Sequence, residues 1–187
     1  PEGSRLVGRA AERELLARRL EELCDDGRKG VIVIEGEAGF GKSLLGAWLH
    51  GAAVGRQVTP LLGSSEPTTR ADAWHPIREV FAQLLELDGT DDPAAAEQAV
   101  ARLLGGHERL LSWAPLLGDL LPTALASNET TARMTGTSRA DALRELLAAL
   151  LQAEAARRPQ LILLEDVHWM DATSWAFVRT IVRSVDR

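Results

Sequence analysis

The sequence contains one stretch whose residue types and spacing predict phosphate chemistry. In residues 36–43, Gly36 and Gly41 are separated by four residues, and Lys42 and Ser43 follow directly. Glycines in such a loop let backbone N–H groups approach a polyphosphate without obstruction by side chains. A lysine adds a full positive charge near the phosphates, and a serine hydroxyl can bind a magnesium ion. The pattern therefore predicts a nucleotide-binding P-loop.

A second stretch carries two adjacent carboxylates, Glu165 and Asp166, directly after the apolar residues 161–164. The apolar run is typical of a strand buried on both faces, and unpaired carboxylates at its end are costly to bury. A magnesium ion beside the P-loop would explain them, with one carboxylate on the metal and the other accepting a proton from water. Carboxylates are also common where a strand emerges into solvent. The P-loop in the same chain favours the functional interpretation.

A dinucleotide-binding loop is the competing glycine-rich interpretation. That loop requires the pattern Gly-x-Gly-x-x-Gly and an acidic residue at the end of the next strand. The next predicted strand, residues 57–62, carries no acidic residue. We therefore set the dinucleotide interpretation aside.

The elements that position these residues can be predicted from apolar periodicity. A β-branched run at residues 31–34 predicts a strand before the P-loop, and a helix continues from Leu44. Further strands are predicted at 57–62, where Pro60 suits an edge, and at 161–164. Helices are predicted at 11–24, from Pro76, at 94–104, in short pieces within 109–121, behind a capping-box pattern at Ser138 and after a cap at Asp171 or Thr173. This order predicts a three-layer α/β domain with a parallel sheet and a helical stretch at about 76–156. Its ligand site should lie at the carboxyl ends of the strands.

The composition is that of a globular domain, with 187 residues, 45% hydrophobic and 26% charged. The net charge of −6 argues against direct contact with nucleic acid. Cys24 is the single cysteine, so no disulfide is possible and a reducing cytoplasm fits. No apolar run approaches the length of a membrane span, and no signal peptide is recognised. Because the chain starts at Pro1 without methionine, we expect it to be a piece of a longer protein.

Several segments together resemble a known family. Residues 164–171, Leu-Glu-Asp-Val-His-Trp-Met-Asp, resemble the acid-Asp-x-His-Trp-x-Asp block of STAND-type signalling ATPases, which are relatives of the AAA+ proteins. Residues 6–9, Leu-Val-Gly-Arg, are similar to the N-terminal box of that family, and residues 36–43 to its P-loop. Residues 134–141 also resemble these modules. The form is best known from proteins with a class III nucleotide cyclase domain or a LuxR-type DNA-binding domain.

The resemblance implies a P-loop NTPase that uses ATP and Mg²⁺, with the chain (residues 1–187) forming the N-terminal part of one domain. Val7, Gly8 and Arg9 would lie near the adenine and ribose. The nucleotide-binding set expected from the resemblance and the P-loop is Val7, Gly8, Arg9, Glu37, Ala38, Gly39, Phe40, Gly41, Lys42, Ser43 and Leu44. Ser43, Glu165 and Asp166 would hold the metal, and Lys42, Glu165 and Asp166 would serve catalysis. Many relatives have Asp where this chain has Glu165, so the roles of the two acids stay open.

The expected function is an ATP-binding and ATP-hydrolysing regulatory switch in a larger signalling protein. The alternative is a module that holds nucleotide and hydrolyses almost none. A phosphotransferase on the same loop would want an arginine-rich lid, and none is evident. The expected partners are ATP or ADP and other domains of the same polypeptide, with self-association possible and no membrane contact. His168 and Trp169 are expected to pack the turn after the acidic strand. Trp74 and His75 are expected to pack the entry of the helix from Pro76. Surface exposure is the favoured interpretation of Arg133, Arg139 and Arg144, over a γ-phosphate contact.

In the family that the chain resembles, a later strand separates the P-loop strand from the acidic strand. We therefore expect a gap in the centre of the sheet of this chain, with unpaired backbone groups on both sides of it. Self-association and poor ATP affinity are the expected consequences.

Overall fold

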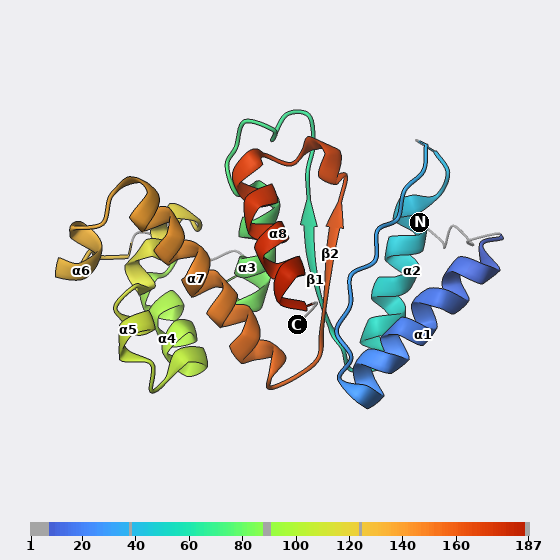
Figure 1. Cartoon of the computed structure of the whole chain (residues 1–187), viewed down its shortest axis with the longest axis horizontal. Helices are drawn as coiled ribbons and strands as arrows, with labels where there is room; N and C mark the ends of the chain where they lie inside the picture. Colours follow the sequence, from blue (N-terminus) through green and yellow to red (C-terminus); the bar gives the residue numbers. More distant parts are fainter. Residues whose placement is uncertain (1–7, 38, 88–90, 124, 186–187) are drawn as a thin grey trace.

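The computed structural model of the chain describes residues 8–37, 39–87, 91–123 and 125–185 (Figure 1). The helices are α1 (Ala10–Asp26), α2 (Lys42–Val54), α3 (His75–Leu84), α4 (Pro93–Leu104), α5 (Glu108–Leu111), α6 (Glu129–Ala132), α7 (Gly136–Ala155) and α8 (Ala172–Val185), with 3₁₀ helices η1 (Ala114–Asp119) and η2 (Val167–Trp169). The strands are β1 (Thr59–Ser64) and β2 (Gln160–Glu165). The described part of the chain is thus an α/β fold, as the sequence predicted.

The two strands form a small parallel sheet. Their register runs from Thr59 opposite Gln160 to Ser64 opposite Glu165, so both strands end at the same edge. The predicted strands at 57–62 and 161–164 are confirmed, and β1 starts and ends two residues later than expected. Pro60 lies on the edge strand, where its missing N–H breaks no ladder bond.

The strand predicted at residues 31–34 is wrong. The structure has no strand there, and Val31, Ile32 and Val33 expose 50%, 42% and 72% of their surface. A strand exists through its ladder bonds to a neighbour, and residues 31–34 form no ladder with β1 or β2. Only Ile34 of this run packs inward, against the same buried cluster as Leu161 and Leu163 of β2.

The sheet separates two apolar layers because successive residues of a strand face opposite sides. On one side, α1 and α2 bury a cluster to which Leu161 and Leu163 of β2 contribute. Arg13 of α1 also lies over the Trp48 ring of α2, 5.4 Å from its centroid. On the other side, Leu61 of β1 packs in the larger core of α3, α4, η1, α7 and α8. The arrangement confirms three layers, with the sheet in the middle (Figure 1).

The helical stretch predicted at about 76–156 is confirmed by α3 to α7, which span residues 75–155. The capping box predicted at Ser138 is wrong, because α7 already begins at Gly136 and the Ser138 hydroxyl donates to the Thr135 carbonyl at 2.8 Å. A capping box occurs instead at α6, where Asn128 and Thr131 exchange side-chain and backbone hydrogen bonds. None of the helices in the described ranges combines the length and the hydropathy of a membrane-spanning segment.

Candidate nucleotide site

The P-loop lies at the N-terminus of α2, as its sequence pattern requires. Gly39 and Gly41 have φ angles of 83° and 75°, in the region that favours glycine, and Gly41 directly precedes the helix. The N–H groups of Ser43 and Leu44 in the first turn of α2 have no acceptor among the described residues. Free N–H groups at the positive end of a helix dipole are suited to an anion.

Two cationic side chains hold the backbone of this loop. Lys42 Nζ donates to the carbonyl oxygens of Gly36 at 2.8 Å and Glu37 at 2.9 Å. Arg9 Nη2 donates to the carbonyl oxygen of Phe40 at 2.6 Å. Arg9 therefore lies beside the P-loop although 31 positions separate it from Phe40 in the sequence. Of the other residues expected at the site, Val7 and Ala38 lie outside the described residues.

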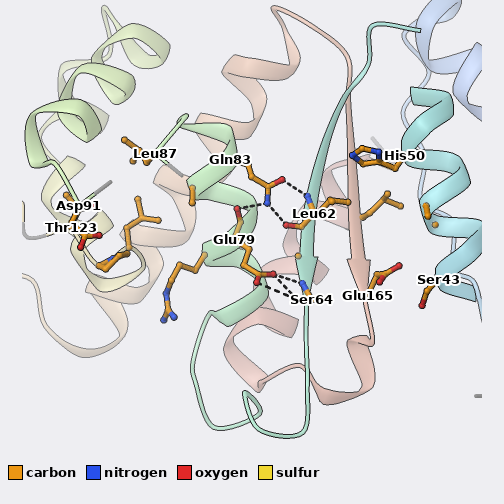
Figure 2. Close-up of a pocket in the computed structure, with 18 residues that line it drawn as sticks. Ser43, His50, Leu62, Ser64, Glu79, Gln83, Leu87, Asp91, Thr123 and Glu165 are labelled. Atoms are coloured by element: carbon orange, nitrogen blue, oxygen red, sulfur yellow. Dashed lines mark hydrogen bonds between the residues drawn. The ribbon is translucent and has the colours of Figure 1, made fainter. Parts of the chain in front are cut away.

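Glu165 points toward the P-loop helix. A β-carbon added at Gly46 of α2 would come within 2.9 Å of Glu165 Oε1, so the carboxylate occupies the space that a side chain at Gly46 would need. Glu165 and Ser43 line one groove of about 840 Å³ between α2, the sheet and α3 (Figure 2). The structure thus brings together the hydroxyl and one of the two carboxylates that the sequence predicted as metal ligands.

Asp166 takes a different direction. It has a φ angle of 51°, it directly precedes η2, and its backbone carbonyl accepts from Trp169 N–H at 2.9 Å. Its exposed carboxylate lies 3.9 Å from Nδ1 of His168 and does not line the groove. Asp166 follows the last residue of β2 and has a left-handed backbone, so its side chain does not continue the alternating directions of the strand.

The other aromatic and acidic residues of the 164–171 block serve local structure. The rings of His168 and Trp169 pack on each other with centroids 5.0 Å apart. The Asp171 carboxylate accepts hydrogen bonds from the N–H groups of Thr173 at 2.8 Å and Ser174 at 3.0 Å, so Asp171 caps α8 as one of the two expected residues. It also accepts from Trp74 N–H at 3.2 Å, which ties α8 to the entry of α3.

The arginines considered for a phosphate contact are engaged elsewhere. Arg139 makes hydrogen bonds of 2.6 and 2.8 Å to the Asp119 carboxylate, which raise the pKa of Arg139 above its usual value. Arg133 and Arg144 pair with acids on their own helical segments. Arg133 is exposed as expected, whereas Arg139 and Arg144 are partly buried.

Sequence reasoning missed the polar residues that α3 contributes to the groove, namely Arg78, Glu79 and Gln83. Arg78 donates to the Asp72 carboxylate at 2.9 and 3.0 Å. Hydrogen bonds from Arg78 and then His75 lower the pKa of Asp72 from 3.8 to about 2. The i, i+4 spacing of Glu79 and Gln83 shows that they share a helix face, but only the structure shows that this face meets the sheet.

The sequence profile of the AAA ATPase domain matches residues 5–187, which is nearly the whole chain. The chain belongs to the AAA ATPase family. Comparisons with curated proteins and with solved structures returned no match. A domain of this family is a nucleotide-binding module of the P-loop type, which agrees with the loop at the start of α2 and with the acidic end of β2.

Proposed function

We propose that this AAA ATPase domain is the ATP-binding and ATP-hydrolysing switch of a larger signalling protein. The observation that carries the proposal is the meeting of Ser43 and Glu165 in one groove at the carboxyl end of the sheet. A hydroxyl and a carboxylate that converge beside a P-loop are the protein ligands expected for a nucleotide-bound Mg²⁺.

The P-loop supplies the phosphate contacts in this proposal. The N–H groups of Gly41 to Leu44 face the polyphosphate, and Lys42 contributes the full positive charge. Because Lys42 now donates to the Gly36 and Glu37 carbonyls, it exchanges these acceptors for phosphate oxygens when ATP binds. Arg9 contacts the loop through the Phe40 carbonyl, and the resemblance implies that Gly8 and Arg9 lie near the adenine and ribose.

The donor set fits Mg²⁺. This ion commonly takes one or two protein oxygens and completes its shell with waters and substrate phosphates. Ser43 and Glu165 provide those two oxygens, and the Glu165 carboxylate has no hydrogen-bond or ion-pair partner among the described residues. When bound, Mg²⁺ would neutralise charge on the β- and γ-phosphates. Asp166 remains the residue proposed to accept the proton of the attacking water.

The direction of Asp166 favours a second candidate function. Its carboxylate lies next to His168 and outside the groove, so a module that holds nucleotide with negligible hydrolysis also agrees with the geometry. Single-turnover measurements with ATP separate the two candidates. If the wild type forms product and Asp166→Asn does not, the result supports the switch. If the bound nucleotide is recovered as unchanged ATP, the result supports the holding module.

The regulatory setting of the switch follows from the resemblance to STAND-type ATPases. The partners proposed are other domains of the same polypeptide, with a cyclase or a LuxR-type DNA-binding domain as the output. A cytoplasmic location suits the use of ATP and the single, exposed Cys24. The net charge of −6 argues against direct nucleic-acid binding by this domain.

Titration of ATP into the Lys42→Ala variant tests the nucleotide site. A hydrogen bond to a charged group contributes about 1.5–3 kcal/mol, so the affinity should fall roughly tenfold to a hundredfold. Lys29→Ala, which removes the only other lysine of the chain, is the matched control and should bind as the wild type does. Equal calorimetric affinities for Lys42→Ala and the wild type would overturn the P-loop assignment.

A further inference from the structure

The outer edge of β1 has no neighbouring strand, yet its backbone donors are accounted for. In the parallel register, residues 59, 61 and 63 turn their backbone groups toward β2, and residues 58, 60, 62 and 64 turn theirs outward. The Val58 N–H donates to the carbonyl of Ala53 at 3.0 Å, and Pro60 has no N–H to satisfy. Leu62 and Ser64 supply the remaining outward N–H groups of the strand.

Side chains of α3 accept these last two donors. The Leu62 N–H donates to Gln83 Oε1 at 2.9 Å, and the Ser64 N–H donates to Glu79 Oε2 at 2.7 Å (Figure 2). The Ser64 hydroxyl also lies 3.1 Å from the same Glu79 oxygen. Every outward N–H between positions 58 and 64 is thus either absent or bonded within the chain.

Gln83 imitates the backbone of a neighbouring strand. While its Oε1 accepts from Leu62 N–H, its Nε2 donates to the Leu62 carbonyl at 2.7 Å. A residue on an adjacent strand would offer Leu62 the same acceptor and donor. The second hydrogen of Nε2 reaches the Glu79 carbonyl at 3.0 Å, which fixes the orientation of the amide. The edge peptide is therefore held by a side chain in the place of a strand.

The close approach of α3 to β1 makes these contacts possible. A β-carbon at Gly63 would come within 2.4 Å of the Pro76 carbonyl oxygen, so the helix can lie this close only because residue 63 is glycine. Four residues of a helix rise about 6 Å, and two residues of a strand rise about 6.6 Å. Glu79 and Gln83 therefore match the spacing of Ser64 and Leu62 along the edge.

We propose that Gln83 and Glu79 close the β1 edge against pairing with a strand of a second copy of this chain. An unprotected edge offers a template for such pairing. The outer edge of β2 shows the contrast, because the backbone groups of Ile162 and Leu164 have no hydrogen-bond partner among the described residues. A strand of a second copy that adds to this sheet would therefore pair with β2 and not with β1. The proposal is independent of ATP binding.

Amide hydrogen exchange measured by NMR on the 187-residue chain tests the cap directly. Gln83→Leu keeps the size of the side chain and removes both hydrogen bonds, so exchange at Leu62 should accelerate at least about tenfold. Gln83→Glu can still accept from the Leu62 N–H and should leave that exchange within about threefold of the wild type. Gln98→Leu, on the exposed face of α4, is the matched control and should change nothing at Leu62. If Gln83→Leu does not fold, Gln83→Ser, which is too short to reach Leu62, replaces it.

A second experiment tests whether loss of the cap lets two copies of the chain pair through β1. All its variants carry Ile162→Lys as the parent substitution, because a lysine there discourages pairing at the β2 edge. Light scattering should find the parent and its Gln98→Leu derivative monomeric, and the Glu79→Ala/Gln83→Leu derivative dimeric or larger. In the associated form, the Leu62 amide should regain protection as concentration rises. An unchanged Leu62 exchange rate in Gln83→Leu would overturn the proposal, and so would a double variant that stays monomeric at every concentration at which it is soluble.

Discussion

Glu165 Oε1 lies so close to Gly46 that a β-carbon on any other residue at position 46 would be 2.9 Å from this oxygen. Gly46 is buried in α2, one turn after Ser43, so the contact sets the carboxylate against the P-loop helix. The glycine is thereby part of the geometry that brings Glu165 and Ser43 into one groove.

Gly46→Ala should weaken the magnesium dependence of ATP binding without lowering the stability of the fold. The added methyl group displaces the Glu165 carboxylate, which is the free end of a flexible side chain, and the magnesium dependence of ATP binding should weaken severalfold. Alanine is favoured over glycine in a helix by about 0.5–1 kcal/mol, so the free energy of unfolding should hold or rise. Gly51→Ala, at an exposed position of α2 with open space around it, is the matched control and should bind normally. Magnesium titrations at fixed ATP together with urea unfolding would check both expectations, and equal magnesium dependence of the two variants would contradict the first.

The two acids at the end of β2 should give different phenotypes, because only Glu165 lines the groove with Ser43. Glu165→Gln should weaken the magnesium dependence of ATP binding. Asp166→Asn should bind ATP and Mg²⁺ as the wild type does and lose hydrolysis by about a hundredfold or more. Glu97→Gln, on the exposed face of α4, is the control for the loss of a carboxylate. Swapped phenotypes in binding and turnover assays would exchange the roles of the two acids, and wild-type turnover in both variants would refute them.

Asp72 should make the free energy of unfolding depend on pH in the acidic range. Hydrogen bonds from Arg78 and His75 lower its pKa from 3.8 to about 2, so the folded state favours the charged carboxylate. The stabilisation is complete above about pH 4 and is lost as the pH falls through 2. Because the side chain is nearly half exposed, Asp72→Asn should cost less than about 1 kcal/mol at pH 6. Urea unfolding from pH 6 to pH 2 should show that the free energies of unfolding of the wild type and the variant converge as the pH falls. A constant difference between these free energies across the range would contradict the assignment.

Local sequence patterns were enough to predict the P-loop, the helix that follows it and the strand β2. The P-loop follows from glycine spacing and from a helix that starts at Lys42, and β2 follows from a continuous apolar run that ends in Glu165. The strand at residues 31–34 could not be judged in this way, because β-branched residues favour a strand but only a neighbouring strand completes it. The contacts of Gly46 with Glu165 and of Gln83 with Leu62 join residues that are far apart in the sequence. No local pattern predicts them.

The open edge of β2 leads to the last prediction. Opposite β1, the outward backbone groups of Ile162 and Leu164 have no partner among the described residues, and the apolar residues 31–33 are exposed. We propose that one more strand fits at this edge and that a second copy of the chain supplies it when the 187-residue chain is isolated. The chain should therefore associate with itself in a concentration-dependent way.

Ile162→Lys should suppress this association, because a charged side chain beside the open edge would have to be desolvated when a strand docks. Leu62→Lys is the matched control, since Leu62 is similarly exposed, at 41% against 37% for Ile162, but lies on the edge that Gln83 closes. Light scattering should find association retained in Leu62→Lys and lost in Ile162→Lys. A 187-residue chain that is monomeric at all concentrations would contradict the proposal that the β2 edge accepts a strand of a second copy.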